Sequence, residues 1–145
     1  MDNIHELDKD VVETLVNMLN GNDTDGVKMA LTILNNADFN DSKIVEAVAM
    51  RQEILVFTDA TVSSLQFLGT TDVFGLQELS HNISILGPNC VIGINNVVYW
   101  MGRDKFFTYS GRVDALPCTL RQYIFNNINY QQAQIFFAGT NNEYN

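Results

Sequence analysis

The sequence predicts a mainly β protein: incomplete β-propeller-like repeats, built from short antiparallel meanders, preceded by an N-terminal α-helical hairpin. Apolar quartets begin at Ile54, Val97 and Ile135, with spacings of 43 and 38 residues. A period near 40 with several short strands per unit is typical of propeller blades. Composition changes near residue 50, because residues 1–50 carry a net charge of −7 and, among aromatic residues, only Phe39. We therefore expect an acidic helical hairpin over residues 1–40 and β-repeats over residues 43–145.

The first segment has helical periodicity. Residues 8–20 carry a helical stripe of apolar side chains, and Gly21 is placed to end that helix. Asp23 and Asp25 offer N-cap oxygens for a second helix, whose apolar face consists of Val27, Ala30, Leu31 and Leu34. Helices of this length depend on tertiary packing, so the hairpin has to dock on another part of the protein.

The first two β-units follow one pattern of apolar quartet, polar turn and second strand. Ile54–Phe57 leads through a turn at residues 58–60 into a run that ends near Gly69. Residues 97–100 lead through Gly102-Arg103-Asp104 into residues 106–109. Each quartet is apolar on both faces, which is typical of a strand packed between two sheets.

The second unit is predicted in more detail, as a three-stranded meander from Cys90 to Tyr109. Asn95-Asn96 lies between two apolar runs, and Asn tolerates the left-handed conformation that a two-residue hairpin requires. Residues 119–127 have a spacing that suits a short helix or turn.

The third unit contains only its opening strand, predicted over Ile135–Ala138, so the repeats are expected to be truncated at the C-terminus. A closed propeller typically has at least four blades. Three alternatives follow: a fragment, an open array capped by the hairpin, or a protomer that completes its sheets with another chain.

Composition limits the possible functions. The chain has 145 residues, 46% of them hydrophobic, and a net charge of −9. Nucleic-acid binding depends on Lys and Arg, so this balance argues against a DNA-coating role. No apolar run approaches the roughly 18 residues of a membrane span.

Residues with catalytic or metal-binding chemistry are few. A nucleophilic Cys90 or Cys118 would need a base, and the two histidines are His5 and His81. Their spacings match no zinc pattern, and two cysteines do not make a disulfide framework, so both should be free thiols. We predict that the protein is not an enzyme and assign no catalytic, cofactor-binding or metal-binding residue.

Two further groups have a structural and a functional interpretation. Four arginines lie near strand or turn ends, and pairing with neighbouring aspartates is favoured over phosphate binding: Arg51, Arg103, Arg112 and Arg121, with Asp59, Asp104 and Asp114. Five aromatic residues would form either a ligand platform or, as we favour, packing between sheets: Tyr99, Trp100, Phe106, Phe107 and Tyr109.

Three stretches resemble the internal repeats of large virion proteins from tailed bacteriophages. They are residues 50–59 (MRQEILVFTD), 82–89 (NISILGPN) and 98–113 (VYWMGRDKFFTYSGRV), the last continuing into residues 116–119. The resemblance covers about residues 43–145 and is to packaged-DNA stabilisation, neck or tail-nozzle-like proteins with propeller-like β domains. In that family the segment matching residues 138–141 continues into another aromatic-rich strand, and residues 1–40 have no counterpart. A gene fragment or mosaic fusion is therefore expected.

The resemblance implies a structural component of a virion tail or neck, located in the virion and assembled in the host cytoplasm. The implied partners are copies of the chain or other virion proteins, with passive proximity to DNA and no membrane, small-molecule substrate or cofactor. An acidic conduit wall would keep passing DNA from adhering. The alternative is a carbohydrate- or receptor-binding β-module, indicated by the aromatic residues and Asn-rich turns.

Overall fold

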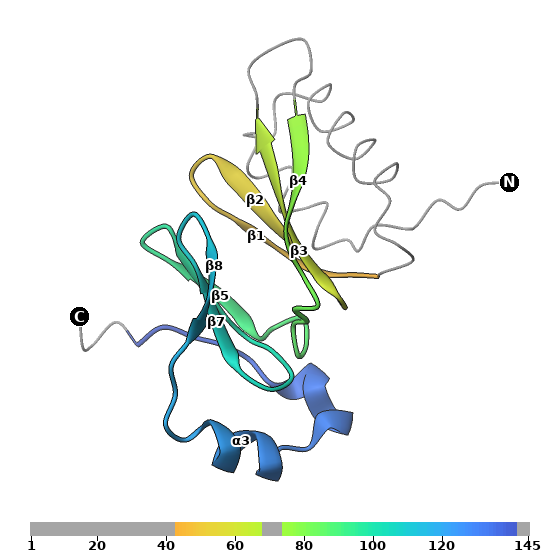
Figure 1. Cartoon of the computed structure of the whole chain (residues 1–145), viewed down its shortest axis with the longest axis vertical. Coiled ribbons are helices and arrows are strands. Elements are labelled where there is room, and N and C mark those ends of the chain that lie inside the picture. Colours follow the sequence, from red (N-terminus) through yellow and green to blue (C-terminus); the bar gives the residue numbers. More distant parts are fainter. Residues whose placement is uncertain (1–42, 68–73, 142–145) are drawn as a thin grey trace, which may run out of the picture.

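The computed structural model describes residues 43–67 and 74–141, which are mainly β. These residues form two antiparallel four-stranded sheets, followed by two short helical segments (Figure 1). The mainly β class expected from the sequence is confirmed. The helical hairpin predicted over residues 1–40 lies outside the described residues.

The first sheet has the strand order β1-β2-β3-β4. Its strands are β1 (Ile44–Ala49), β2 (Glu53–Thr58), β3 (Thr61–Phe67) and β4 (Phe74–His81). The predicted strand over Ile54–Phe57 is confirmed as the centre of β2. Its turn into β3 is closed by the Thr58 hydroxyl, which accepts hydrogen bonds from the backbone N–H groups of Ala60 (3.1 Å) and Thr61 (2.8 Å). A Thr hydroxyl used in this way replaces a backbone acceptor in the turn.

The second sheet repeats this arrangement with the order β5-β6-β7-β8. Its strands are β5 (Val91–Ile94), β6 (Val97–Met101), β7 (Phe106–Tyr109) and β8 (Val113–Leu116). Asn95 and Asn96 have φ angles of 52° and 64°, the left-handed conformation predicted for the β5–β6 hairpin. The Gly102 N–H donates to the Lys105 carbonyl (2.9 Å) in the β6–β7 turn. The predicted meander is confirmed, and β8 adds a fourth strand.

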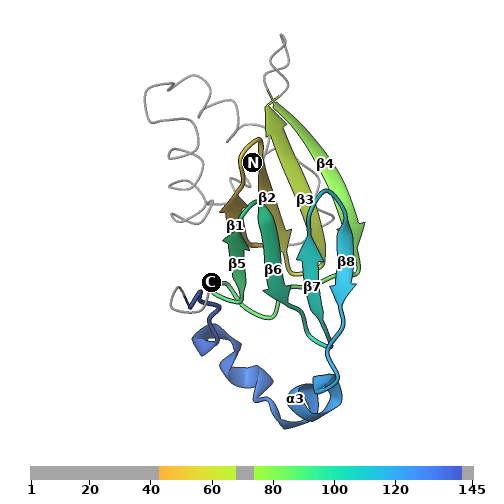
Figure 2. The same cartoon turned by 90° about the vertical axis from the view of Figure 1, so that its left-hand side faces the viewer.

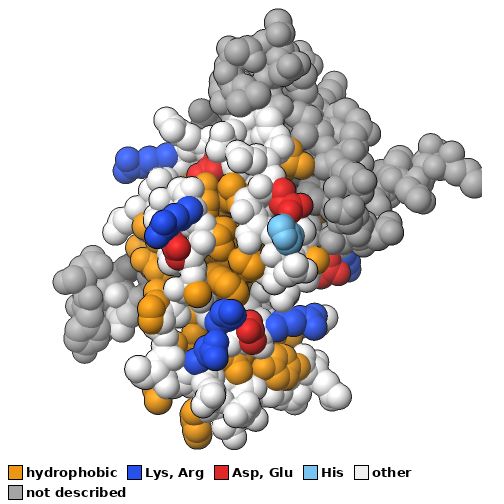
Figure 3. Space-filling view, in the orientation of Figure 1, with side chains coloured by type: hydrophobic (Ala, Val, Ile, Leu, Met, Phe, Trp, Pro, Cys, Tyr) orange, Lys and Arg blue, Asp and Glu red, His pale blue; other side chains and the backbone are white. Residues whose placement is uncertain are grey.

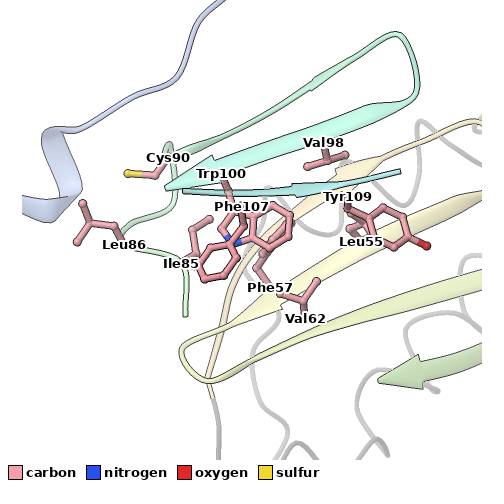
Figure 4. Packing of buried hydrophobic residues seen from close by; sticks show 10 residues of the cluster. All are labelled: Leu55, Phe57, Val62, Ile85, Leu86, Cys90, Val98, Trp100, Phe107 and Tyr109. Carbon is pink, nitrogen blue, oxygen red and sulfur yellow. The ribbon is translucent and has the colours of Figure 1, made fainter. Parts of the chain in front are cut away.

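The two sheets stack face to face. Figure 2 shows their strands in the same left-to-right order, with β3 and β7 running one way and β4 and β8 the other. Buried side chains from both sheets form one cluster between them, completed by residues of the β4–β5 connection (Figure 4): Leu55, Phe57, Val62, Ile85, Leu86, Cys90, Val98, Trp100, Phe107 and Tyr109. Trp100 is its centre, because its ring meets Phe57 edge-on at 5.2 Å and stacks on Phe107 at 5.4 Å between centroids.

The C-terminal part is helical where the sequence predicted a strand. Of the short helix or turn expected over residues 119–127, the structure has the helix, α3 (Arg121–Asn127). The prediction of a strand over Ile135–Ala138 is wrong. Residues Tyr130–Ile135 form the 3-10 helix η1, and residues 136–141 belong to no helix or strand. The physical reason is that this apolar run packs by alternate side chains on the existing cluster: Phe136 contacts it, whereas Ile135 and Phe137 are exposed.

Neither helical segment in the described part of the chain is long and apolar enough to cross a membrane.

Candidate functional site: an apolar face on the second sheet

One face of the second sheet is directed away from the first sheet and carries apolar side chains. Strand register places Ile92 opposite Tyr99, and Phe106 between Met101 and Leu116. These residues alternate along the strands with Val98, Trp100 and Phe107, which pack in the cluster between the sheets. We call this set, Ile92, Tyr99, Met101, Phe106 and Leu116, the outer face. Tyr99 and Leu116 retain 36% and 39% of their accessible surface.

An apolar groove of about 210 Å³ lies along this face. Besides the outer face, it is lined by Cys90, Trp100, Phe107 and the C-terminal residues Phe136–Ala138. The C-terminal wall is fixed by a hydrogen bond from the Ala138 N–H to the Asn89 carbonyl (2.8 Å). Figure 3 views the two sheets from their edge, so the outer face is directed to the left of that view.

The groove has little chemistry beyond apolar contact. Burial raises the pKa of the Cys90 thiol, which keeps it protonated and a poor nucleophile. Its Sγ lies 3.7 Å from the Phe136 carbonyl oxygen. The indole N–H of Trp100 is buried and has no hydrogen-bond partner among the described residues. The arrangement therefore fits the packing of another apolar surface better than a reaction.

A polar cluster joins the two sheets. The Tyr109 hydroxyl, on β7, donates to the Glu53 carboxylate on β2, 3.1 Å from each oxygen. Ser64 and Gln66, on β3, donate to the same carboxylate, Gln66 over 3.4 Å. Burial, and then the nearby Glu53 charge, raise the pKa of Tyr109 to about 12. The cluster links the sheets through the one acid that faces the second sheet from β2.

Sequence reasoning missed this cluster, although one signal was present. Glu53 immediately precedes the apolar quartet and shares its strand face with Leu55 and Phe57. An acid on a core-facing position requires hydrogen-bond partners, because an isolated buried charge is costly. The sequence does not reveal that one partner is Tyr109, 56 residues away.

The candidate nucleophiles and their candidate base lie in different surroundings. Cys90 is buried and Cys118 half-buried, and both are free thiols, as predicted. His81 lies beside Glu78, with its Nδ1 3.3 Å from the carboxylate. Among residues 43–67 and 74–141, no three His, Cys, Asp or Glu side chains come together as a metal site.

The predicted arginine–aspartate pairing is confirmed at one turn. Arg112 Nε lies 2.7 Å from the Asp114 carboxylate. The other two aspartates have lysine partners: Asp59 accepts from the Lys43 backbone N–H (3.1 Å), and Asp104 lies 3.9 Å from Lys105 Nζ.

The five aromatic residues divide between the two interpretations. Trp100, Phe107 and Tyr109 are buried between the sheets, as favoured from the sequence. Tyr99 is exposed on the outer face, and Phe106 packs on Phe125 of α3 at 5.3 Å between centroids.

Comparison with known proteins gives no relative from which to transfer a function. No protein-family model matches the chain, and no curated protein matches it significantly.

Proposed function

We propose that the protein is a structural component of a phage virion, of the tail, neck or packaged-DNA-stabilisation type, that works by stacking β-sheets. The observation that carries the proposal is the pair of stacked sheets with an apolar outer face that is only partly covered by α3 and the C-terminal residues. A face of this kind in contact with water favours association with another surface. The resemblance of residues 43–145 to phage virion repeats supplies the virion setting.

The two sheets are proposed to be successive blades of an incomplete propeller-like array. Their common strand order and direction support this, because repeat architectures stack equivalent units in one sense (Figure 2). In such a stack, each sheet uses the same face to contact the next sheet. The first sheet contacts the second through the face that carries Leu55 and Phe57, and the equivalent face of the second sheet is the outer face. Its partner would be a further sheet, from another copy or from another virion protein.

The charge of the chain is compatible with a position near DNA. The net charge of −9 would keep a passing duplex from adhering to the protein. Most of this excess lies in the first 50 residues, which carry −7. Any contact with DNA in this proposal is therefore passive.

Association through the outer face is tested by light scattering of the full chain over a hundredfold dilution series. We expect concentration-dependent self-association, or association with a purified virion protein, that is lost in Tyr99→Asp/Leu116→Asp. Leu120→Asp is the matched control, because Leu120 is 62% exposed but does not line the groove. Equal behaviour of the two variants would contradict a role for the outer face.

The virion setting is tested separately by mass spectrometry of gradient-purified particles from the phage whose genome encodes this chain. We expect its peptides in a fixed ratio to the major tail proteins. Abundant protein in the lysate but none in the particles would contradict the proposal.

A second candidate is a carbohydrate- or receptor-binding β-module, favoured by the exposed Tyr99 ring beside the groove. Trp100 is buried and therefore a poor candidate for stacking on a sugar. Reproducible glycan-array binding that is lost in a folded Tyr99→Ala variant would favour this module over sheet stacking.

A further inference from the structure

An exposed aromatic ring lies beside the outer-face groove. Phe137 retains 82% of its accessible surface, more than any other large hydrophobic residue in the described part of the chain. It also lines the groove. Figure 1 shows the C-terminal segment that carries it running to the left of the view, the side to which the outer face is directed. An exposed ring and an apolar groove are therefore neighbours on one side of the molecule.

The residues on either side of Phe137 are anchored. Phe136 packs on the cluster between the sheets. The Ala138 N–H donates to the Asn89 carbonyl over 2.8 Å. The backbone therefore holds the Phe137 ring beside the groove, although the ring itself is exposed. A group that is already positioned loses less conformational entropy on binding than a mobile one.

The size and lining of the groove define what fits it. An apolar cavity of about 150 Å³ holds a benzene molecule, whereas sites for drug-sized ligands measure about 300–1,000 Å³. At about 210 Å³, the groove has room for one aromatic ring. No charged side chain occurs among the described residues that line it. An uncharged aromatic side chain is therefore a better occupant than a charged or larger group.

The charge of the described residues permits two copies to meet. These residues carry six Lys or Arg and six Asp or Glu, so their net charge is zero. Two copies that face each other through this part of the chain have no net like charge to overcome. A twofold interface uses the same surface patch on both copies, so the patch has to contain both complementary elements. The outer side of the second sheet contains both, in the ring and the groove.

We propose that two copies of the chain associate outer face to outer face, with Phe137 of each copy inserted into the groove of the other. This inference rests on the association through the outer face proposed above and names a second copy as the partner. Both rings and both grooves are used in one twofold contact, so the assembly closes at two chains. A stack in which each sheet packs on the next would instead continue to grow.

Sedimentation equilibrium of the full chain tests the contribution of the ring. We expect a monomer–dimer equilibrium whose dissociation constant rises about thirtyfold or more in Phe137→Ala, the effect of removing a central aromatic anchor. Tyr123→Ala is the matched control, because Tyr123 is 72% exposed and does not line the groove. Equal dissociation constants for the two variants, or species larger than dimers in the parent, would overturn the proposal. Trp100 fluorescence checks that each variant is folded.

A mixing experiment separates insertion into the other copy from a role in the wall of the same groove. Phe137→Ala keeps the side chains of the outer face, and Tyr99→Asp/Leu116→Asp keeps the Phe137 ring. A mixed dimer of the two variants can form one of the two ring–groove contacts. We expect this dimer to be about tenfold tighter than either variant with itself. No gain on mixing would overturn the exchange of rings.

Photocrosslinking then locates the ring. Benzoylphenylalanine replaces Phe137, and mixing ¹⁴N and ¹⁵N chains separates intermolecular from intramolecular products. We expect intermolecular crosslinks to peptides that contain residues 90–101 or Leu116, and intramolecular products alone would overturn the proposal. A monomeric parent that binds a virion protein through its outer face would overturn the exchange and leave the proposed function intact. A Phe137-dependent dimer that is absent from purified particles would support the exchange and reject the virion role alone.

Discussion

The two sheets share strand order and connections but differ in burial. In β2, five of six residues are buried, on both faces of the strand. In β6, burial alternates, with Val98 and Trp100 buried and Tyr99 exposed. The two quartets are similarly apolar, so the difference comes from the neighbours of each sheet and not from strand composition. A sheet with one partly exposed apolar face is the natural place to look for a partner.

The largest expected effect is at the contact between the sheets. Trp100→Ala removes the ring that contacts both Phe57 and Phe107 and should lower the free energy of unfolding by about 3–5 kcal/mol. Urea unfolding followed by circular dichroism measures this loss. A loss below about 1 kcal/mol would mean that the sheets are stable without packing on each other.

A matched pair of isoleucines tests the difference in burial between the sheets. Ile54→Ala, on the side of β2 directed away from the second sheet, should lower the free energy of unfolding by about 2–4 kcal/mol, because Ile54 is buried. Ile92→Ala, on the half-buried outer face, should cost about 1 kcal/mol. The same unfolding assay compares them, and equal losses would contradict the asymmetry between the two sheets.

The polar link between the sheets should contribute less. Tyr109→Phe removes the donor to the Glu53 carboxylate and should cost about 1–2 kcal/mol, since Ser64 and Gln66 still donate to it. Ser80→Ala, at a partly buried position on β4, is a control for a small polar change elsewhere.

Tyr109 also gives this link a pH dependence. Its pKa is raised to about 12 in the folded protein, so between pH 10 and about 12 the unfolded chain loses this proton first. The contribution of Tyr109 to stability is therefore complete below pH 10 and is lost as pH rises toward 12. The difference in stability between parent and Tyr109→Phe should shrink over that range, and a constant difference would contradict the raised pKa.

The smallest effect on stability is expected at the outer face. Tyr99→Ser should change the free energy of unfolding by about 1 kcal/mol or less, because Tyr99 retains 36% of its accessible surface. Binding of a hydrophobic dye should fall, since the apolar area of this face becomes smaller. A loss above about 2 kcal/mol would show that Tyr99 belongs to a packed core.

Features set by neighbouring residues could be predicted from the sequence. Asn95-Asn96 adopts the left-handed hairpin conformation because Asn tolerates positive φ, and that preference is local. The short helix at residues 121–127 likewise follows from spacing within one segment. The burial of Trp100 between sheets followed from the apolar quartet that contains it.

Features that depend on distant residues could not be predicted. Ile135–Ala138 has the composition of a strand, but among the described contacts its only backbone hydrogen bond to another part of the fold is from the Ala138 N–H to the Asn89 carbonyl. Apolar composition alone does not provide a partner strand. The Glu53–Tyr109 link and the outer-face groove also require knowledge of which residues meet across the two sheets.

The consecutive strand order of both sheets has a consequence for folding. Each strand pairs with its neighbours in sequence, so most backbone pairing has low contact order and forms through short loops. Contacts between the sheets join residues 43 and 56 positions apart, as in Phe57–Trp100 and Glu53–Tyr109. Closing these longer loops costs more entropy, so we expect the sheets to meet after their hairpins have formed. Substitutions between the sheets should then mainly accelerate unfolding, and kinetic stability would reside in the contact between the sheets more than in the strands themselves.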